Sequence, residues 1–299
     1  MLTPRSYFLK TTIKESFSKP FLTIDKQINL LKSRGMLFRD EAKAKYYIEN
    51  LNYYRLTGYW LIFEKDHSTH AFKENTYFED ILNLYIFDRE LRLLLLDAIE
   101  RIEVSIKSKL SYHLAESFGS HALLKPEIFT SASKYSKTLV KLKSEIDRNR
   151  SELFIKHHFD KYKEELPPIW VCVEVMTLGQ ISNWLNNIKE RKYKQIISKN
   201  YDLDEKILCS FLHHLTIIRN ACAHHSRIWN KRFTLDFTLP KNPINLNKRL
   251  NYEKRRYIYN TLIMCEYLMN IICENNHWSV KLDNLIKNHS INAEKMGYL

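Results

Sequence analysis

The stretch IIRNACAHHSRIWN, residues 217–230, gathers residue types that can do chemistry on a phosphate. Four residues separate Arg219 from His224, and Asn220 stands beside the arginine. Histidine can exchange protons near neutral pH, and arginine grips phosphate oxygens through a planar charged fork. An amide can donate to a phosphate oxygen or hold an imidazole in one tautomer. These residue types suit the cleavage of RNA.

RNA carries its own nucleophile, the 2′-hydroxyl. A nuclease therefore needs only to remove that proton, protonate the departing 5′-oxygen and stabilise the negative charge of the crowded phosphate. The products are a 2′,3′-cyclic phosphate and a 5′-hydroxyl, and DNA is not cut because it lacks the nucleophile. Arg219, Asn220 and His224 are therefore candidates for catalysis that needs no metal or other cofactor, with His225 and Arg227 as supporting candidates.

Helical geometry separates the two main side chains. A helix is expected over residues 204–230, anchored in a core by the amphipathic segment EKILCSFLHHLTII. At about 100° per residue, His224 and Arg227 each fall within about 40° of Asn220, whereas Arg219 points about 140° away from His224. Either the helix is distorted there, or two copies of the motif combine across the two-fold axis of a homodimer.

Other interpretations of the cluster stay open. Asn220, His224 and Arg227 can form a hydrogen-bonded helix face that does no chemistry. A metal site through Cys222, His224 and His225 has no fourth ligand at a suitable spacing.

The RxxxxH pattern alone is not specific. Arg150 and His157 form a second, looser match within a highly charged stretch, and we expect both on the surface.

Composition predicts a mostly α-helical protein with an anionic partner. The 299 residues include only 5 Gly and 7 Pro, so few residues break helices. The net charge of +13 favours binding to a polyanion, and both nucleic acid and an anionic membrane surface fit that description. The longest apolar run, around Leu93–Leu96, is too short to cross a membrane. The N-terminus lacks the features of a secretory signal, so we expect a cytoplasmic protein. The five Cys have no CxxC spacing and are expected to be reduced core thiols.

The elements that position the motif are expected to be helices. Residues 1–20 are expected to form a tail, residues 63–75 an irregular segment, and Pro240 and Pro243 a loop. Periodicity, caps and breakers predict helices over residues 23–35, 40–58, 78–118, 131–165, 167–188, 204–230 and 250–276.

Several separated stretches resemble one family. NYYRLTGYW, LPPIWVCVEVMTLG and RNACAHHSRIWNKRF, together with YIFDRELRLLLLDAIERIEVSIKSKL, are similar to the Abi-like proteins of the AbiD/AbiF group, which are bacterial abortive-infection factors. The resemblance covers about residues 20–235. Motifs that recur in order are far more specific than RxxxxH alone.

The resemblance implies an all-α fold of the HEPN superfamily, a helical bundle in which an RxxxxH motif supports RNase activity in a dimer. It implies that Arg219 and His224 are catalytic, with Asn220 beside them. It places an Abi-like HEPN domain over residues 21–240, with the C-terminal helices of 241–299 packed on the same core.

The resemblance also suggests helpers and partners. An acidic residue such as Glu103 or Glu174 can assist, although a salt bridge within a helix is the simpler role for each. Members of the group are linked to small noncoding RNAs that restrain them. Tyr53, Tyr54 and Arg55 are candidates for stacking on RNA bases, although core packing is the simpler role for tyrosines at this spacing.

The leading hypothesis is a homodimeric endoribonuclease of phage defence or of a toxin–antitoxin system. The alternatives are a dimer that sequesters a structured noncoding RNA without cutting it, and a protein scaffold that binds no RNA.

Overall fold

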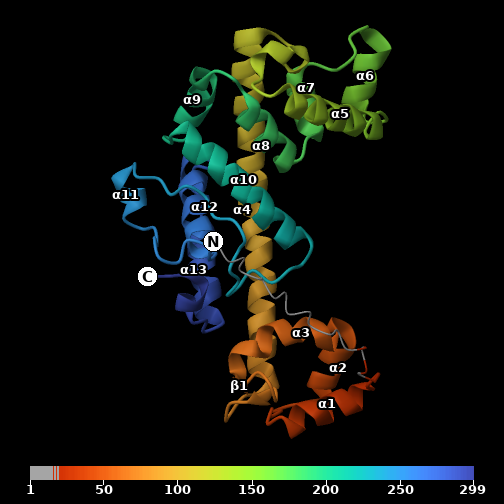
Figure 1. The fold of residues 1–299 in the computed structure, drawn as a ribbon, viewed down its shortest axis with the longest axis vertical. Coiled ribbons are helices and arrows are strands. Elements are labelled where there is room, and N and C mark those ends of the chain that lie inside the picture. The colour runs from red at the N-terminus through yellow and green to blue at the C-terminus, as the bar shows by residue number, and fades with distance from the viewer. Residues whose placement is uncertain (1–15, 17, 19) are drawn as a thin grey trace, which may run out of the picture. The chain divides into compact units, whose positions relative to one another are not determined.

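The described part of the chain is built almost entirely from helices (Figure 1). The computed structural model describes residues 16, 18 and 20–299, so the expected tail over residues 1–20 lies largely outside the described residues. Within this part there are 13 α-helices and one sheet of two short strands. The predicted all-α fold class is confirmed.

The described residues up to Leu82 and those from Asn83 onward form two compact units. The elements that lie wholly in the first unit are α1 (Ile24–Ser33), α2 (Glu41–Leu51), α3 (Tyr53–Trp60), the 3-10 turn η1 (Leu61–Phe63), β1 (Glu64–Asp66) and β2 (Ala71–Phe72).

Local signals account for most of the first unit. The Thr23 hydroxyl accepts the Lys26 N–H and starts α1, and Gly35, with φ +93°, follows its end as predicted. The prediction of a single helix over residues 40–58 is wrong, because Asn52 takes φ 64° and divides this stretch into α2 and α3. Asn52 then caps α3 by accepting the Tyr54 N–H at 2.9 Å. The segment expected to be irregular contains the antiparallel pair β1 and β2.

The long helix α4 (Phe78–Phe118) has the bounds that its uninterrupted periodicity predicts, and most of it belongs to the second unit. The other elements of that unit are η2 (Ala122–Leu124), η3 (Pro126–Ile128), α5 (Ala132–Arg148), α6 (Leu153–Lys161), α7 (Ile169–Val175), α8 (Leu178–Asn187), α9 (Arg191–Lys199), α10 (Glu205–Ala223), α11 (Ile244–Asn247), α12 (Tyr259–Ile272), α13 (Trp278–Asn288) and η4 (Ala293–Met296).

Helix α4 supplies much of the core of the second unit. Leu91, Leu95 and Ile106 are fully buried, and the indole N–H of Trp278 on α13 donates to the Leu94 carbonyl at 2.8 Å. Leu93, by contrast, is 54% exposed, so the apolar run in this helix is not buried all round.

Two predicted helices are each divided in two. The stretch expected over residues 131–165 forms α5 and α6, and the stretch over 167–188 forms α7 and α8. Helix α7 ends because Thr177 starts α8 with a capping box. The Thr177 hydroxyl accepts the Gln180 N–H at 3.3 Å, and the Gln180 side-chain oxygen accepts the Thr177 N–H at 2.8 Å. The last long helix, expected from residue 250, begins at Tyr259.

The five cysteines are free thiols, and all but the half-buried Cys273 lie in the core, as predicted. Burial raises the pKa of Cys172 and Cys222 to about 12, which keeps both protonated. None of the helices in the described ranges combines the length and the apolar character needed to cross a bilayer.

His214 on α10 is held in the core as a neutral ring. Its Nδ1–H donates to the Leu235 carbonyl at 3.1 Å, and Nε2 therefore accepts the hydroxyl proton of Thr261, 2.9 Å away on α12. Burial lowers the pKa of His214 to about 4, although the Leu235 carbonyl partly opposes this shift.

The stability of the fold should therefore fall in mild acid. The pKa of His214 in the folded protein lies below its unfolded value, so its contribution is complete above about pH 6.5 and is lost as the pH falls toward 4. Between pH 7 and pH 5 the expected loss is about 2 kcal/mol in the free energy of unfolding by urea. His214→Gln, which cannot titrate, should flatten this dependence. An equal pH slope in both proteins would contradict the prediction.

Candidate functional site

Helix α10 presents Arg219 and Asn220 on its last turns. Asp204 caps its N-terminus, and buried residues such as Phe211, Leu215 and Ile218 anchor it in the core. The helix is regular through Ala223, and the His224 N–H still donates to the Asn220 carbonyl at 2.9 Å. Arg219 and His224 therefore keep the angular separation of a regular helix, and the distorted helix considered from the sequence is not observed.

The helix expected to continue to residue 230 ends at Ala223. The His225 N–H donates to the Cys222 carbonyl and the Ser226 N–H to the Ala221 carbonyl, which is the hydrogen-bond pattern of a Schellman motif. His225 fills the left-handed position of this motif, with φ 55°. His225 thus ends the helix.

A buried ion pair on α4 holds the segment that follows. The Asp88 carboxylate is fully buried and accepts the N–H groups of Ile228 and Trp229, at 3.2 and 2.7 Å. It pairs with Arg92 one turn along the same helix, and Arg92 donates to the Ser226 carbonyl at 3.3 Å. Arg227 is half-buried in this held segment and lies beyond the end of the helix. The prediction that it shares a helical face with Asn220 and His224 is therefore wrong.

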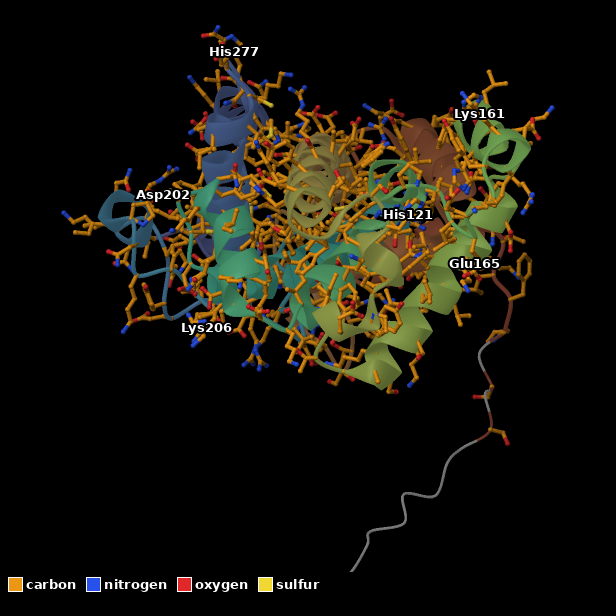
Figure 2. The ribbon with its side chains drawn as sticks, turned by 90° about the horizontal axis from the view of Figure 1, so that it is seen from above. His121, Lys161, Glu165, Asp202, Lys206 and His277 are labelled. Atoms are coloured by element: carbon orange, nitrogen blue, oxygen red, sulfur yellow. The ribbon has the colours of Figure 1, made fainter. Side chains whose placement is uncertain are left out.

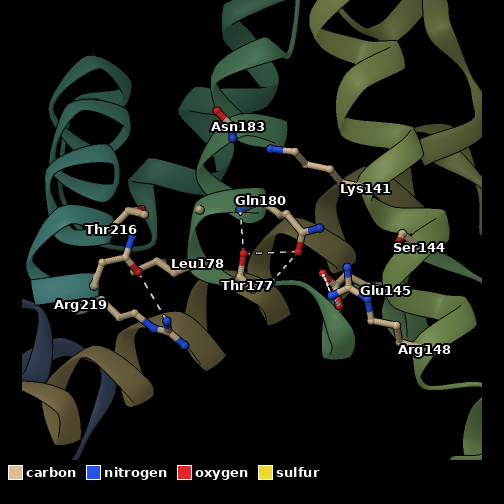
Figure 3. A pocket seen from close by; sticks show the side chains of 12 residues that line it. Lys141, Ser144, Glu145, Arg148, Thr177, Leu178, Gln180, Asn183, Thr216 and Arg219 are labelled. Atoms are coloured by element: carbon tan, nitrogen blue, oxygen red, sulfur yellow. Dashed lines mark hydrogen bonds and ion pairs between the residues drawn. The ribbon is translucent and has the colours of Figure 1, made fainter. Parts of the chain in front are cut away.

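Arg219 and Asn220 form part of the wall of an open groove between α5, α8 and α10 (Figure 3). Its volume is about 420 Å³. The lining residues are mostly cationic, amide or hydroxyl-bearing: Lys141, Ser144, Glu145, Arg148, Thr177, Leu178, Gly179, Gln180, Asn183, Thr216, Arg219 and Asn220.

Gly179 allows α8 to pack closely on α10 beside the groove. A Cβ at this position would lie 3.2 Å from the Thr216 methyl group, tighter than ordinary contact. The capping box of Thr177 and Gln180 fixes the start of α8 at the same place. Both residues belong to the stretch MTLGQ, so this part of the groove is built by a short local sequence.

The structure brings together only part of the predicted catalytic set. Arg219 is half-buried and reaches its neighbour Asn220 through a weak hydrogen bond of 3.4 Å. His224 is exposed at the end of the helix and is not among the described residues that line the groove. Within the described ranges, no three His, Cys, Asp or Glu residues are arranged to hold a metal ion.

The two acidic candidates lie together, away from this groove. Glu103 pairs with Lys107 at 3.1 Å, the ion pair that their spacing predicts, and the Lys107 amine also donates to the Glu174 carbonyl at 3.4 Å. Neither Glu103 nor Glu174 lines the groove that holds Arg219.

The aromatic candidates divide between packing and exposure. In the first unit, the Tyr53 ring packs edge-on against Trp60, and its hydroxyl accepts a hydrogen bond from Arg34 at 3.2 Å. Tyr54 is 82% exposed, and Arg55 is exposed beside it. Core packing explains Tyr53, whereas Tyr54 stays a candidate for stacking on a base.

The looser motif match behaves as predicted. Arg150 and His157 are both exposed, Arg150 in the connection between α5 and α6 and His157 on α6. The Arg150 guanidinium stacks over the Phe159 ring at 3.9 Å.

The residues that face Arg219 across the groove are not among those predicted from the sequence. Lys141 and Arg148 come from α5, and Gln180 and Asn183 come from α8. Only the TLGQ capping pattern, which marks the start of α8, was visible locally. The α5 residues carry no local signal, because other lysines of the second unit, such as Lys161 and Lys206, project from its surface elsewhere (Figure 2).

The buried pair on α4 should dominate the stability of this region. Asp88→Ala removes the buried carboxylate that accepts two backbone N–H groups and pairs with Arg92, and we expect a loss of about 3–5 kcal/mol in urea unfolding. Asp97→Ala is the matched control, since Asp97 pairs with Arg101 at the same spacing on the same helix but at the surface. It should cost less than about 1 kcal/mol. Equal losses in both variants would refute this account.

His225 should be replaceable by glycine. Its left-handed backbone favours Gly, so His225→Gly should raise the free energy of unfolding by roughly 0.5–1 kcal/mol, whereas a β-branched Val should lower it. The adjacent His224→Gly, at φ −90°, should gain nothing. Thermal melts of the three variants test this, and a destabilised His225→Gly would show that the histidine side chain itself supports the turn.

Comparison with known proteins places the chain in a family. The family described as Abi-like protein matches residues 46–230, more than half of the chain, and this range contains both Arg219 and the α5 and α8 walls of the groove. Searches of curated proteins and of solved structures found no match. On the strength of the family match, the chain belongs to the Abi-like proteins.

Proposed function

We propose that this Abi-like protein is a metal-independent endoribonuclease of a phage-defence system, of the abortive-infection or toxin–antitoxin type. The observation that carries the proposal is the setting of Arg219 and Asn220 on a core-anchored helix, in the wall of an open groove rich in cations and amides. The family match and the RxxxxH spacing of Arg219 and His224 support it. The proposal includes membership of the HEPN superfamily.

Each catalytic residue has a distinct role in the proposed reaction. His224, exposed at the end of α10, removes the 2′-hydroxyl proton or protonates the departing 5′-oxygen. Arg219 stabilises the charge that builds up on the phosphate oxygens, and Asn220 donates a further hydrogen bond. The attack closes a 2′,3′-cyclic phosphate and releases the 5′-oxygen as a hydroxyl.

A homodimer completes the proposed site. Because α10 is regular through Ala223, Arg219 and His224 of one chain point about 140° apart and cannot both face one phosphate. Pairing of two chains about a two-fold axis lets Arg219 of one copy act with His224 of the other. The net charge of +13 supports RNA as the substrate and a small noncoding RNA as a restraining partner.

Substitution of either main residue should abolish cleavage without unfolding the protein. Purified protein is incubated with total RNA in EDTA, and the 2′,3′-cyclic phosphate ends are quantified. Arg219→Ala and His224→Ala should each lose at least about 100-fold in rate. Arg150→Ala and His157→Ala are matched controls, because they remove the same residue types from the surface and should keep full activity.

Mixed dimers test the two-chain site within the same assay. Arg219→Ala and His224→Ala chains, unfolded and refolded together, form heterodimers that keep one intact pair, so about a quarter of the wild-type activity should return. Full activity in either single variant would refute the site. RNA that is retained tightly but gives no cyclic ends would instead favour the sequestering dimer.

A further inference from the structure

The groove that holds Arg219 carries more positive charge than its own carboxylate can balance. Lys141, Arg148 and Arg219 contribute three cations and Glu145 one anion. Leu178 is the one aliphatic side chain of any size among the described lining residues. Pockets for apolar small molecules are lined mainly by hydrophobic and aromatic side chains, so this lining does not suit such a ligand.

Two of these cations have no carboxylate partner among the described residues. Within that part of the chain, the Arg219 guanidinium hydrogen-bonds only to the side chain of Asn220, and the Lys141 amine forms no ion pair. Arg148, by contrast, pairs with Glu145 at 3.2 Å. Like charges that converge on one groove repel each other, and an anion between them removes that repulsion. The charge arrangement therefore selects an anionic ligand.

Neutral donors complete the wall opposite Arg219. The Gln180 side-chain oxygen is occupied by the Thr177 cap, and its NH₂ group has no hydrogen-bond partner among the described residues. Figure 3 shows Lys141 and Asn183 on facing helices, with the Lys141 amine directed toward Asn183. Amide N–H groups and amines are donors to phosphate oxygens and ribose hydroxyls alike.

The groove is open, with Lys141, Arg148 and Asn183 exposed at its rim, so a chain can pass through it. A free phosphate or a mononucleotide would be enclosed more fully at a site built for it. Single-stranded nucleic acid is bound along grooves of this kind, where cations follow the backbone.

We propose that Lys141 and Arg148 of α5, with the amides of Gln180 and Asn183, hold a phosphate of the RNA strand next to the linkage that is cleaved. This inference rests on the proposed function and extends it. Arg219 belongs to both sites, so it connects the bound backbone to the reacting phosphate. The α5 residues act in binding and positioning, and His224 acts in the chemistry.

The test separates binding from cleavage. The His224→Ala protein, which should not cut, is titrated with a fluorescent single-stranded RNA of mixed sequence in EDTA at several salt concentrations. Lys141→Ala and Arg148→Ala are each introduced separately into the His224→Ala protein. Each should weaken RNA binding about 5–10-fold and reduce the steepness of the plot of log association constant against log salt concentration by about 0.7. Lys143→Ala is the matched control on the same helix, because Lys143 pairs with Glu165 outside the groove. It should leave the slope unchanged.

Each outcome decides one of the two proposals. Slopes unchanged by Lys141→Ala and Arg148→Ala, with cleavage by the wild-type protein intact, would overturn the groove assignment and leave the nuclease standing. Lowered slopes without cyclic ends from the wild-type protein would support the groove and overturn the nuclease. If Lys141→Ala weakens the binding of inorganic phosphate or of a mononucleotide but leaves RNA binding unchanged, the groove binds a small anion. That result would overturn the assignment of the groove to the RNA backbone. Melting temperatures of the variants confirm folding.

Discussion

The ion pair of Asp88 and Arg92 is the constraint on which the candidate site depends. A carboxylate removed from water is stable only when its charge and its lone pairs are satisfied. Here the carboxylate accepts two backbone N–H groups, from Ile228 and Trp229, and it pairs with Arg92, which also contacts the Ser226 carbonyl. This pair holds the chain that leaves α10 against α4. His224, the C-cap of α10, is exposed to solvent next to this held segment.

The groove beside that helix combines two kinds of construction. Gly179 and the Thr177 cap bring α8 close to α10 through local, sterically specific contacts. The cationic side comes from α5, a helix from a distant part of the sequence, through Lys141 and Arg148. Under the functions proposed here, α10 carries the groups that react and α5 carries groups that bind. Such a division lets binding be altered without moving the catalytic residues.

Two histidines on one helix show how burial separates structural from chemical residues. His214 and His224 lie ten residues apart, but His214 is enclosed between the Leu235 carbonyl and Thr261, and burial lowers its pKa to about 4. It is therefore a neutral hydrogen-bonding group of the core. His224 is exposed and able to meet a substrate. Each of the two belongs to a pair of adjacent histidines, so the immediate sequence does not distinguish them.

The sequence by itself determined the all-α class, the bounds of α4 and α1, the RxxxxH motif and the resemblance to Abi-like proteins. These features rest on local periodicity, caps and residue order, which any segment carries with it. Tertiary structure alone decided how residues 226–229 are held against α4 and which residues share a groove with Arg219. Those outcomes depend on partners far away in the chain. Asp88 binds the Trp229 N–H across 141 residues, and no local pattern reports a contact of that range.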